Sequence, residues 1–163
     1  MTKTHSGKAS VTLPTDTQIL IVREFAAPRH LVYRAWTNAD LVKKWWGGLR
    51  GEMQVVDIDL RVGGKWRYVM RAHGGFEVAF HGEYRELVPS ERIVTTEIYE
   101  GAPEPPEPPL NIITFREPSP GHTRLELLVL CPNPELRDII ANSGMEAGLQ
   151  EQMDLLEQLA VSL

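Results

Sequence analysis

Large aromatic side chains are the residues of this sequence best suited to chemistry, because they can bury a small molecule and hydrogen-bond to it. Two of the four tryptophans are adjacent, Trp45 and Trp46, in the stretch KKWWGG (43–48). Adjacent helical residues point about 100° apart, so one buried stripe does not easily take both rings. Trp45 lies four residues after Leu41 and continues a buried stripe, which leaves Trp46 to face the mouth of a cavity. Packing of both rings in the core is the alternative.

Strand alternation gathers more large side chains on one face. In GKWRYVMRA (64–72), Trp66, Tyr68 and Met70 share a side, and the next strand repeats the pattern. Methionine and leucine recur at helical spacing in the last helix. An apolar pocket with a few polar groups is the usual design of a small-molecule site, although the same side chains also suit an ordinary core. The candidate ligand-binding residues are Trp45, Trp46, Trp66, Tyr68, Met70, Phe80, Tyr84, Met145, Leu149 and Met153.

A cyclase-like or hydrolase-like site would need a titratable group inside such a cavity. The residues near which to look are His81, Tyr84, Glu97 and Tyr99. Alternation puts His81 and Tyr84 on opposite faces and gives Glu97 and Tyr99 one face, with an exposed glutamate as the alternative. The sequence contains no H-E-x-x-H, phosphate-loop, G-x-S-x-G or dinucleotide motif, and its histidines lack metal-ligand spacing. It therefore predicts no catalytic set, no metal and no cofactor.

The elements that must position these residues follow from periodicity. A β-branched run predicts a first strand over 17–27, and Pro28 suits the first turn of a helix. TNAD (37–40) offers caps for a second short helix, which Gly47 and Gly48 end. Period-two alternation then predicts six strands, at about 52–61, 64–72, 76–87, 92–100, 110–117 and 122–131.

The order of these elements predicts an α+β fold, because a doubly wound α/β fold needs helices between successive strands. The economical packing is a curved antiparallel sheet of about seven strands wrapped around the long C-terminal helix, with a cavity on its concave face. Residues 1–14 are polar and predict a mobile tail before a single domain over 15–163. GAPEPPEPP (101–109) predicts a stiff exposed loop, or a docking site for a proline-recognition module.

Composition limits the classes of partner. The 163 residues carry a net charge of −5, and Lys and Arg are scattered singly, which argues against a broad nucleic-acid surface. No stretch suits a signal peptide or a membrane span. The lone cysteine, Cys131, predicts a buried inert thiol. We therefore expect a cytoplasmic protein that does not insert into membranes.

Four stretches carry a resemblance to a known family: LPTDTQILIVREFAAPRHLVYRAWTNADLVKKWWGG, DLRVGGKWRYVM, HGEYRELVPSERIVTTE and SGMEAGLQEQMDLLEQL. Over about residues 12–163 the chain resembles the START-like, birch-pollen-allergen-like (SRPBCC) superfamily. More narrowly, it is similar to single-domain bacterial homologues of the activator of the heat-shock-protein-90 ATPase. The resemblance implies a helix-grip fold with two short helices after the first strand. Members often carry tryptophan after the glycine of the last helix, where this chain has Leu149.

Three functions follow from these observations. The first is binding of a hydrophobic or aromatic small molecule between the sheet and the C-terminal helix. The second, implied by the resemblance, is a protein-interaction module that modulates a chaperone ATPase. The third is a cyclase-like or hydrolase-like enzyme that uses the same cavity. Edge strands of the sheet allow either a monomer or a homodimer.

Overall fold

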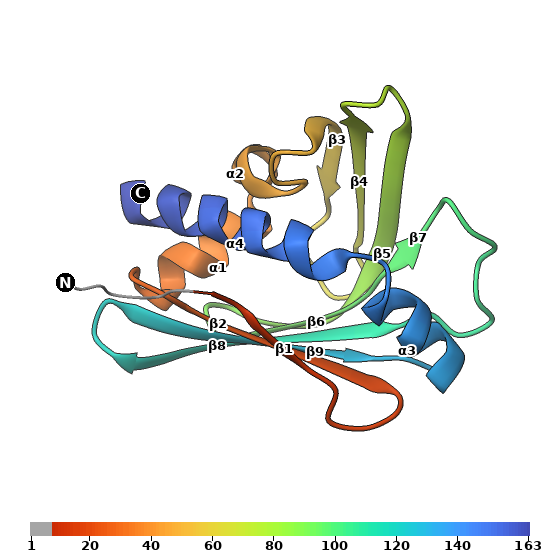
Figure 1. Ribbon diagram of the computed structural model, residues 1–163. Helices are drawn as coiled ribbons and strands as arrows, with labels where there is room; N and C mark the ends of the chain where they lie inside the picture. Colours follow the sequence, from red (N-terminus) through yellow and green to blue (C-terminus); the bar gives the residue numbers. More distant parts are fainter. Residues whose placement is uncertain (1–7) are drawn as a thin grey trace.

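The computed structural model describes residues 8–163, which fold into a curved antiparallel sheet with helices on its concave side (Figure 1). The strands are β1 Ser10–Thr12, β2 Gln18–Phe25, β3 Gly51–Ile58, β4 Lys65–Ala72, β5 Glu77–Val88, β6 Arg92–Thr96, β7 Ile98–Tyr99, β8 Leu110–Ser119 and β9 His122–Leu130. The helices are α1 Arg29–Thr37, α2 Ala39–Trp45, α3 Pro134–Ala141 and α4 Met145–Ser162. The strand order is β1-β2-β9-β8-β6-β5-β4-β3, with β7 paired to β5. The predicted α+β helix-grip fold is confirmed.

The sheet has nine strands rather than about seven, and β1 is one of the two additions. It pairs antiparallel with β2, and the Gln150 side chain on α4 exchanges two hydrogen bonds with the backbone of Ala9, of 3.0 and 2.8 Å. Strand β1 therefore lies inside the range 1–14, for which the sequence predicts a tail. Residues 1–7 of that range fall outside the described residues.

The other additional strand comes from a division of the segment predicted as one strand over 92–100. Strand β6 pairs with β8 and with the part of β5 that begins at Tyr84, whereas β7 pairs with β5 at Phe80 and His81. Glu97 lies between β6 and β7, outside both ladders. The alternation of side chains across the junction is preserved, so this division does not change which residues share a face.

The sheet bends sharply where β5 changes partners, and Figure 1 shows β3 and β4 rising at a large angle to β2, β8 and β9. Two threonine hydroxyls replace ladder hydrogen bonds there. The hydroxyl of Thr95 donates to the Glu83 carbonyl (3.0 Å), and that of Thr96 accepts from the Glu83 backbone N–H (2.9 Å). Gly82 lies at the bend, because a Cβ atom there would overlap the Thr96 carbonyl oxygen.

The two short helices lie where the sequence predicts them. Pro28 precedes α1, and the Asn38 side chain caps α2 by accepting a hydrogen bond from the Leu41 backbone N–H (3.1 Å). Gly47 follows α2 with φ of 89°, a left-handed conformation that glycine adopts without strain. In residues 8–163, no helix has the length and apolar character needed to cross a membrane.

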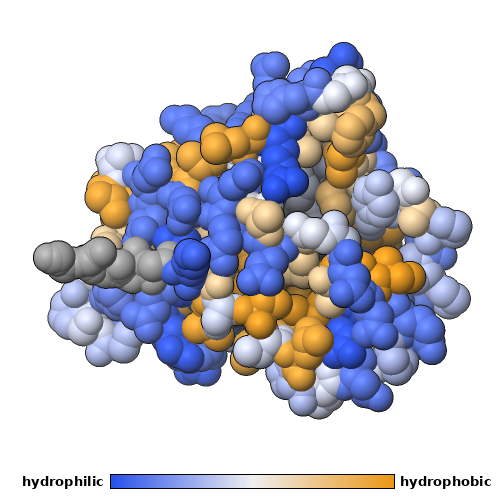
Figure 2. Space-filling view, viewed as in Figure 1, coloured by the Kyte–Doolittle hydropathy of each residue, from blue (hydrophilic) through white to orange (hydrophobic). Residues whose placement is uncertain are grey.

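Helix α4 crosses the concave side of the sheet (Figure 1), and its two halves are buried to different extents. Met153, at the middle of the helix, and Leu156 and Ala160, in its second half, are buried, whereas no residue of its first two turns is fully buried. Gly144, at its N-cap, provides no side-chain hydrogen bond. Figure 2 shows hydrophobic residues reaching the surface among polar ones on this side of the molecule. The first half of α4 is therefore packed less tightly against the rest of the protein than the second half.

The second half of α4 is fastened to the sheet by a buried arginine. Arg23, on β2, is only 1% exposed, because it occupies an inward-facing position on the same face of the strand as Ile and Phe residues. Its guanidinium donates to Asp154 (3.0 Å) and to Glu157 (2.9 Å) on α4, and lies 5.1 Å from the ring centroid of Phe25. A buried charge needs such partners, so this cluster fixes where the helix rests.

Candidate functional site

A continuous row of aromatic rings lines the concave face near the first half of α4. Neighbouring ring centroids are 4.7 Å apart for Trp66 and Tyr68, 5.3 Å for Tyr68 and Trp46, 5.4 Å for Trp46 and Phe80, and 5.2 Å for Phe80 and Tyr99. We call these five residues the aromatic wall. Exposure falls along it from 46% at Tyr99 to 5% at Trp66. The wall therefore leads from solvent into the interior.

Two tyrosine hydroxyls lie at the buried end of the aromatic wall. Tyr68 is 8% exposed and Tyr84 is 4% exposed. Burial raises the pKa of both hydroxyls, and the nearby Tyr84 and Glu97 raise that of Tyr68 further. Within residues 8–163, neither hydroxyl has a protein hydrogen-bond partner. Since buried polar groups are ordinarily paired, these two are available to a bound molecule or to water.

Glu97 adds a carboxyl group to the same region. Its Oε1 atom accepts a hydrogen bond from the Asn111 side-chain amide (3.0 Å), and Asn111 alternates along β8 with the buried core residues Ile113 and Phe115. Burial raises the pKa of the Glu97 carboxyl group, and the Asn111 hydrogen bond opposes that shift. No salt bridge to Glu97 occurs in the described part of the chain. The alternative of an exposed outer-face glutamate is thus excluded by its contacts.

The indole of Trp66 is held in place by a hydrogen bond to Thr95. Its Nε1–H donates to the Thr95 hydroxyl at 2.7 Å, and the ring lies across from Gly82, its partner in the β4–β5 ladder. A glycine opposite a large ring leaves room for that ring to cover the neighbouring strand. The inner end of the aromatic wall therefore depends on the threonines and the glycine at the bend.

The structure separates the two adjacent tryptophans. Trp46 joins the aromatic wall, in contact with Tyr68 and Phe80. Trp45 is 2% exposed, packs against Trp36 with ring centroids 4.9 Å apart, and donates its indole N–H to the Ala35 carbonyl (2.9 Å). The structure therefore brings Trp46, but not Trp45, to the other aromatic candidates.

Of the four remaining candidates, two are buried in the core and two are half-buried on α4. Met153, on α4, is buried in the core, and Met70 is buried beside Gly47, where an added Cβ atom would lie 2.6 Å from the Met70 Sδ atom. Met145 and Leu149 are half-buried on the first half of α4 and pack against the core. These last two lie on the first two turns of α4, where no residue is fully buried.

His81 lies on the outer face of the sheet, away from this site. Its Nδ1 is 2.8 Å from Glu100 Oε2, and Arg67 donates two hydrogen bonds of 2.9 Å to the same carboxylate. The hydrogen bond from Arg67 lowers the pKa of Glu100 to about 2. An open pocket of about 390 Å³ adjoins this cluster. No group of three His, Cys, Asp or Glu side chains able to hold a metal ion occurs in residues 8–163.

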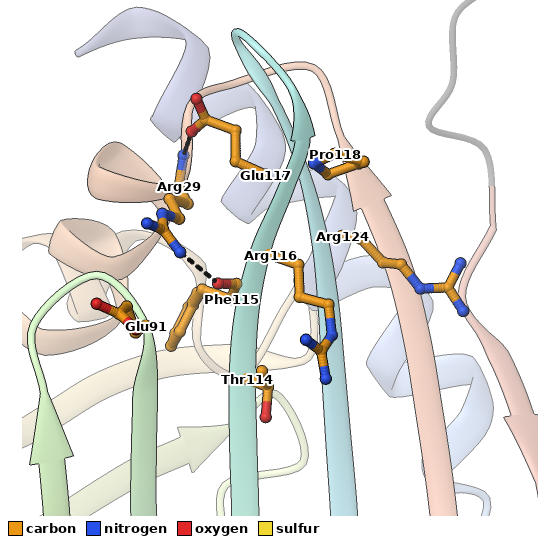
Figure 3. Close-up of a pocket in the computed structure, with 8 residues that line it drawn as sticks. All are labelled: Arg29, Glu91, Thr114, Phe115, Arg116, Glu117, Pro118 and Arg124. Carbon is orange, nitrogen blue, oxygen red and sulfur yellow. Dashed lines mark hydrogen bonds between the residues drawn. The ribbon is translucent and has the colours of Figure 1, made fainter.

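A second open pocket, of about 310 Å³, lies around the end of β8 (Figure 3). Arg29 points toward the Phe115 carbonyl (3.4 Å), and Arg116 and Arg124 both bind Glu126 through hydrogen bonds of 3.1 and 3.0 Å. These last two arginines are neutralised by carboxylates. Neither of the two pockets lies between the sheet and α4, where the sequence places its cavity.

Removing the charge of Glu97 has a predictable effect on stability. Glu97 is half-buried, and because desolvation raises its pKa in the folded state, ionising it costs more free energy in the folded protein than in the unfolded one. We expect Glu97→Gln to unfold at a higher urea concentration than wild type at pH 7. As pH falls through the raised folded pKa toward the ordinary value of 4.5, wild type gains stability relative to the variant. If the difference in stability between wild type and Glu97→Gln does not change with pH, the burial of this carboxyl group is contradicted.

Comparison with known proteins agrees with this architecture. The family described as "Activator of Hsp90 ATPase homolog 1-like protein" matches residues 26–160. A crystal structure of a protein from Rhodobacter sphaeroides has a TM-score of 0.85 and 24% identity, covering 96% of this chain and 100% of its own. A protein from Chromobacterium violaceum has a TM-score of 0.72 and 28% identity, covering 90% of this chain and 98% of its own.

A solution structure from Arthrobacter aurescens is similar in fold, with a TM-score of 0.82 and 19% identity over 94% of this chain and 92% of its own. No curated protein sequence matches the chain. The family match spans most of the described residues, including α1, α2, the aromatic wall and most of α4. The chain therefore belongs to the family of activator of Hsp90 ATPase homolog 1-like proteins.

Proposed function

We propose that this protein binds a hydrophobic or aromatic small molecule on the concave face of the sheet, beneath the first half of α4. One observation carries the proposal. The aromatic wall runs from the exposed Tyr99 ring to the buried hydroxyls of Tyr68 and Tyr84, which lack partners in the described residues. Apolar surface with a few convergent polar groups is the usual composition of a small-molecule site.

The ligand gains most of its affinity from burial of apolar surface, at roughly 25 cal/mol per Å². The hydroxyls fix its orientation through hydrogen bonds. Space is made by movement of Met145 and Leu149, whose side chains are half-buried on the less tightly packed turns of α4. Methionine suits this role because its unbranched side chain adopts many rotamers.

Native mass spectrometry of the protein purified from its own cells tests the proposal. We expect a released small molecule after denaturation, and a change in tryptophan fluorescence when that molecule is added back. If the protein carries nothing, and a panel of lipids and aromatic compounds changes neither its fluorescence nor its melting temperature, the proposal is wrong.

A tryptophan in place of Leu149 is expected to close the site. The larger ring would extend from the first half of α4 toward the aromatic wall and occupy the space that the ligand needs. We expect Leu149→Trp to weaken ligand binding by about 100-fold or more, equivalent to about 3 kcal/mol, with the fold retained. Fluorescence titration and circular dichroism provide the two measurements.

The matched control is Leu159→Trp, which adds the same ring at a half-buried position near the other end of α4. Its affinity should stay within about threefold of wild type. Equal losses in the two variants would indicate general disturbance of α4, and unchanged affinity in Leu149→Trp would place the ligand elsewhere.

Modulation of a chaperone ATPase is the second candidate, and the description of the matched family favours it. A direct test measures the ATPase rate of an Hsp90 chaperone with and without this protein. A rate that rises saturably with added protein would support this candidate. An unchanged rate, with no complex in gel filtration, would exclude it under those conditions.

A further inference from the structure

The concave face carries two charged side chains at central positions, and only one of them is neutralised. Arg23 is paired with Asp154 and Glu157. Glu97 accepts one hydrogen bond, from the neutral Asn111 amide, and has no salt bridge in residues 8–163. The charge on the concave face that lacks an oppositely charged partner is therefore negative.

Three oxygen atoms near this charge lack hydrogen-bond donors among the described residues. They are Glu97 Oε2 and the hydroxyl oxygens of Tyr68 and Tyr84. Glu97 lies between Thr95, which pairs with Tyr84, and Tyr99, which pairs with Phe80, and Phe80 pairs in turn with Tyr68. A protonated primary amine has three N–H donors, which matches three acceptor oxygens in number. A charge-assisted hydrogen bond to a carboxylate is among the stronger ones in proteins.

The aromatic wall adds a second source of attraction for a cation. The faces of Trp, Tyr and Phe rings are electrostatically negative, and a cation within about 6 Å of a ring centroid is attracted to them. Four rings of the wall, those of Trp46, Tyr68, Phe80 and Tyr99, form consecutive contacts on the side of the sheet that Glu97 shares. The same rings bury the apolar part of a ligand.

We propose that the concave site selects a primary amine with an aromatic or alkyl body, with its ammonium group bound by Glu97 and its body against the aromatic wall. This inference rests on the proposed small-molecule site and names the chemical class that the site takes. A ligand with a neutral oxygen, to which the tyrosine hydroxyls would donate, is the competing outcome of the test.

Three probes with the same ring separate these outcomes: 1-naphthylmethylamine, 1-naphthylmethanol and 1-naphthoic acid. Isothermal titration calorimetry at neutral pH gives the dissociation constant of each for the wild-type protein. We expect the amine to bind about ten- to a hundredfold more tightly than the alcohol, since a hydrogen bond to a charged group contributes about 1.5–3 kcal/mol. The acid should bind most weakly.

Glu97→Gln should remove the preference for the amine and leave the affinity for the alcohol within about threefold of wild type. Glu146→Gln is the matched control, because Glu146 is an exposed carboxylate on the first turn of α4. It should preserve the preference. In wild type, lowering the pH should weaken binding of the amine as Glu97 becomes protonated, without weakening binding of the alcohol. This measurement needs no variant.

Equal binding of amine and alcohol, or tightest binding of the acid, would overturn the amine inference and leave the small-molecule site standing. A preference for the amine that survives Glu97→Gln would also overturn it. If no probe binds, the amine inference falls, and native mass spectrometry of the purified protein decides separately whether a small-molecule site exists.

Discussion

Replacing Arg23 with alanine is expected to lower the free energy of unfolding by about 3–5 kcal/mol, the cost of breaking a buried ion pair from one side. The guanidinium joins β2 to Asp154 and Glu157 of α4 and is almost completely buried. Its removal leaves a cavity beneath the helix and deprives Glu157, itself mostly buried, of its charged partner, so that only the hydrogen bond from the Ala26 backbone N–H remains. Equilibrium urea unfolding, followed by far-ultraviolet circular dichroism, measures the loss.

Arg124→Ala is the control for this prediction. Arg124 also pairs with carboxylates, those of Glu24 and Glu126, but it is 42% exposed. An exposed ion pair contributes about 1 kcal/mol or less, so this variant should unfold close to wild type. Similar losses in the two arginine variants would contradict the account of Arg23 as the residue that fastens α4.

Gly82→Ala should cost about 3 kcal/mol or more, above the usual range for one extra methyl group in a core. A Cβ atom at this position would overlap the Thr96 carbonyl oxygen and lie 2.6 Å from Trp66 Nε1. Backbone and a buried indole cannot both move aside without opening the bend between β5 and β6. We expect a lower urea midpoint and a weakened near-ultraviolet signal from the displaced tryptophan.

Gly75→Ala tests whether crowding, rather than loss of glycine freedom, causes this effect. Gly75 has φ of 92° and no atom within 4 Å of an added Cβ, so its substitution carries only the conformational cost of about 1–2 kcal/mol. Should Gly82→Ala be the milder of the two, the close approach of β5 and β6 at Gly82 would be contradicted.

Periodicity was sufficient to predict the elements that hold the site. Alternation correctly assigned Trp66 and Tyr68 to the buried face of β4, and Tyr84 to the same side of β5. It also correctly gave Glu97 and Tyr99 one face. These positions follow from strand geometry alone, because successive side chains of a strand point to opposite faces.

Periodicity did not predict contacts between residues that are far apart in the sequence. An arginine in a β-branched strand gives no sign that two carboxylates of the last helix, at residues 154 and 157, will bury it. The pairing of Asn111 with Glu97 was missed for the same reason, although Asn111 alternates with Ile113 and Phe115. A polar residue at an inward position of an apolar strand is the signal that could have found it.

The adjacent tryptophans show where a local pattern stops being informative. Both belong to one short segment at the end of α2, yet Trp45 completes the packing between α1 and α2 while Trp46 reaches the sheet. Trp45 is the last residue of α2, whereas Trp46 is its C-cap and has extended backbone angles. The surroundings of each ring depend on the tertiary fold, which the segment alone does not specify.

The most direct test of the small-molecule site is the ¹H–¹⁵N spectrum of the tryptophan indole groups during titration with 1-naphthylmethylamine or the molecule released from the purified protein. The four indoles report on different places, since Trp46 and Trp66 belong to the aromatic wall and Trp36 and Trp45 pack against each other. We expect the Trp46 signal to shift most and the Trp45 signal to stay in place. Shifts at Trp36 and Trp45 without change at Trp46 and Trp66 would contradict a site on the concave face.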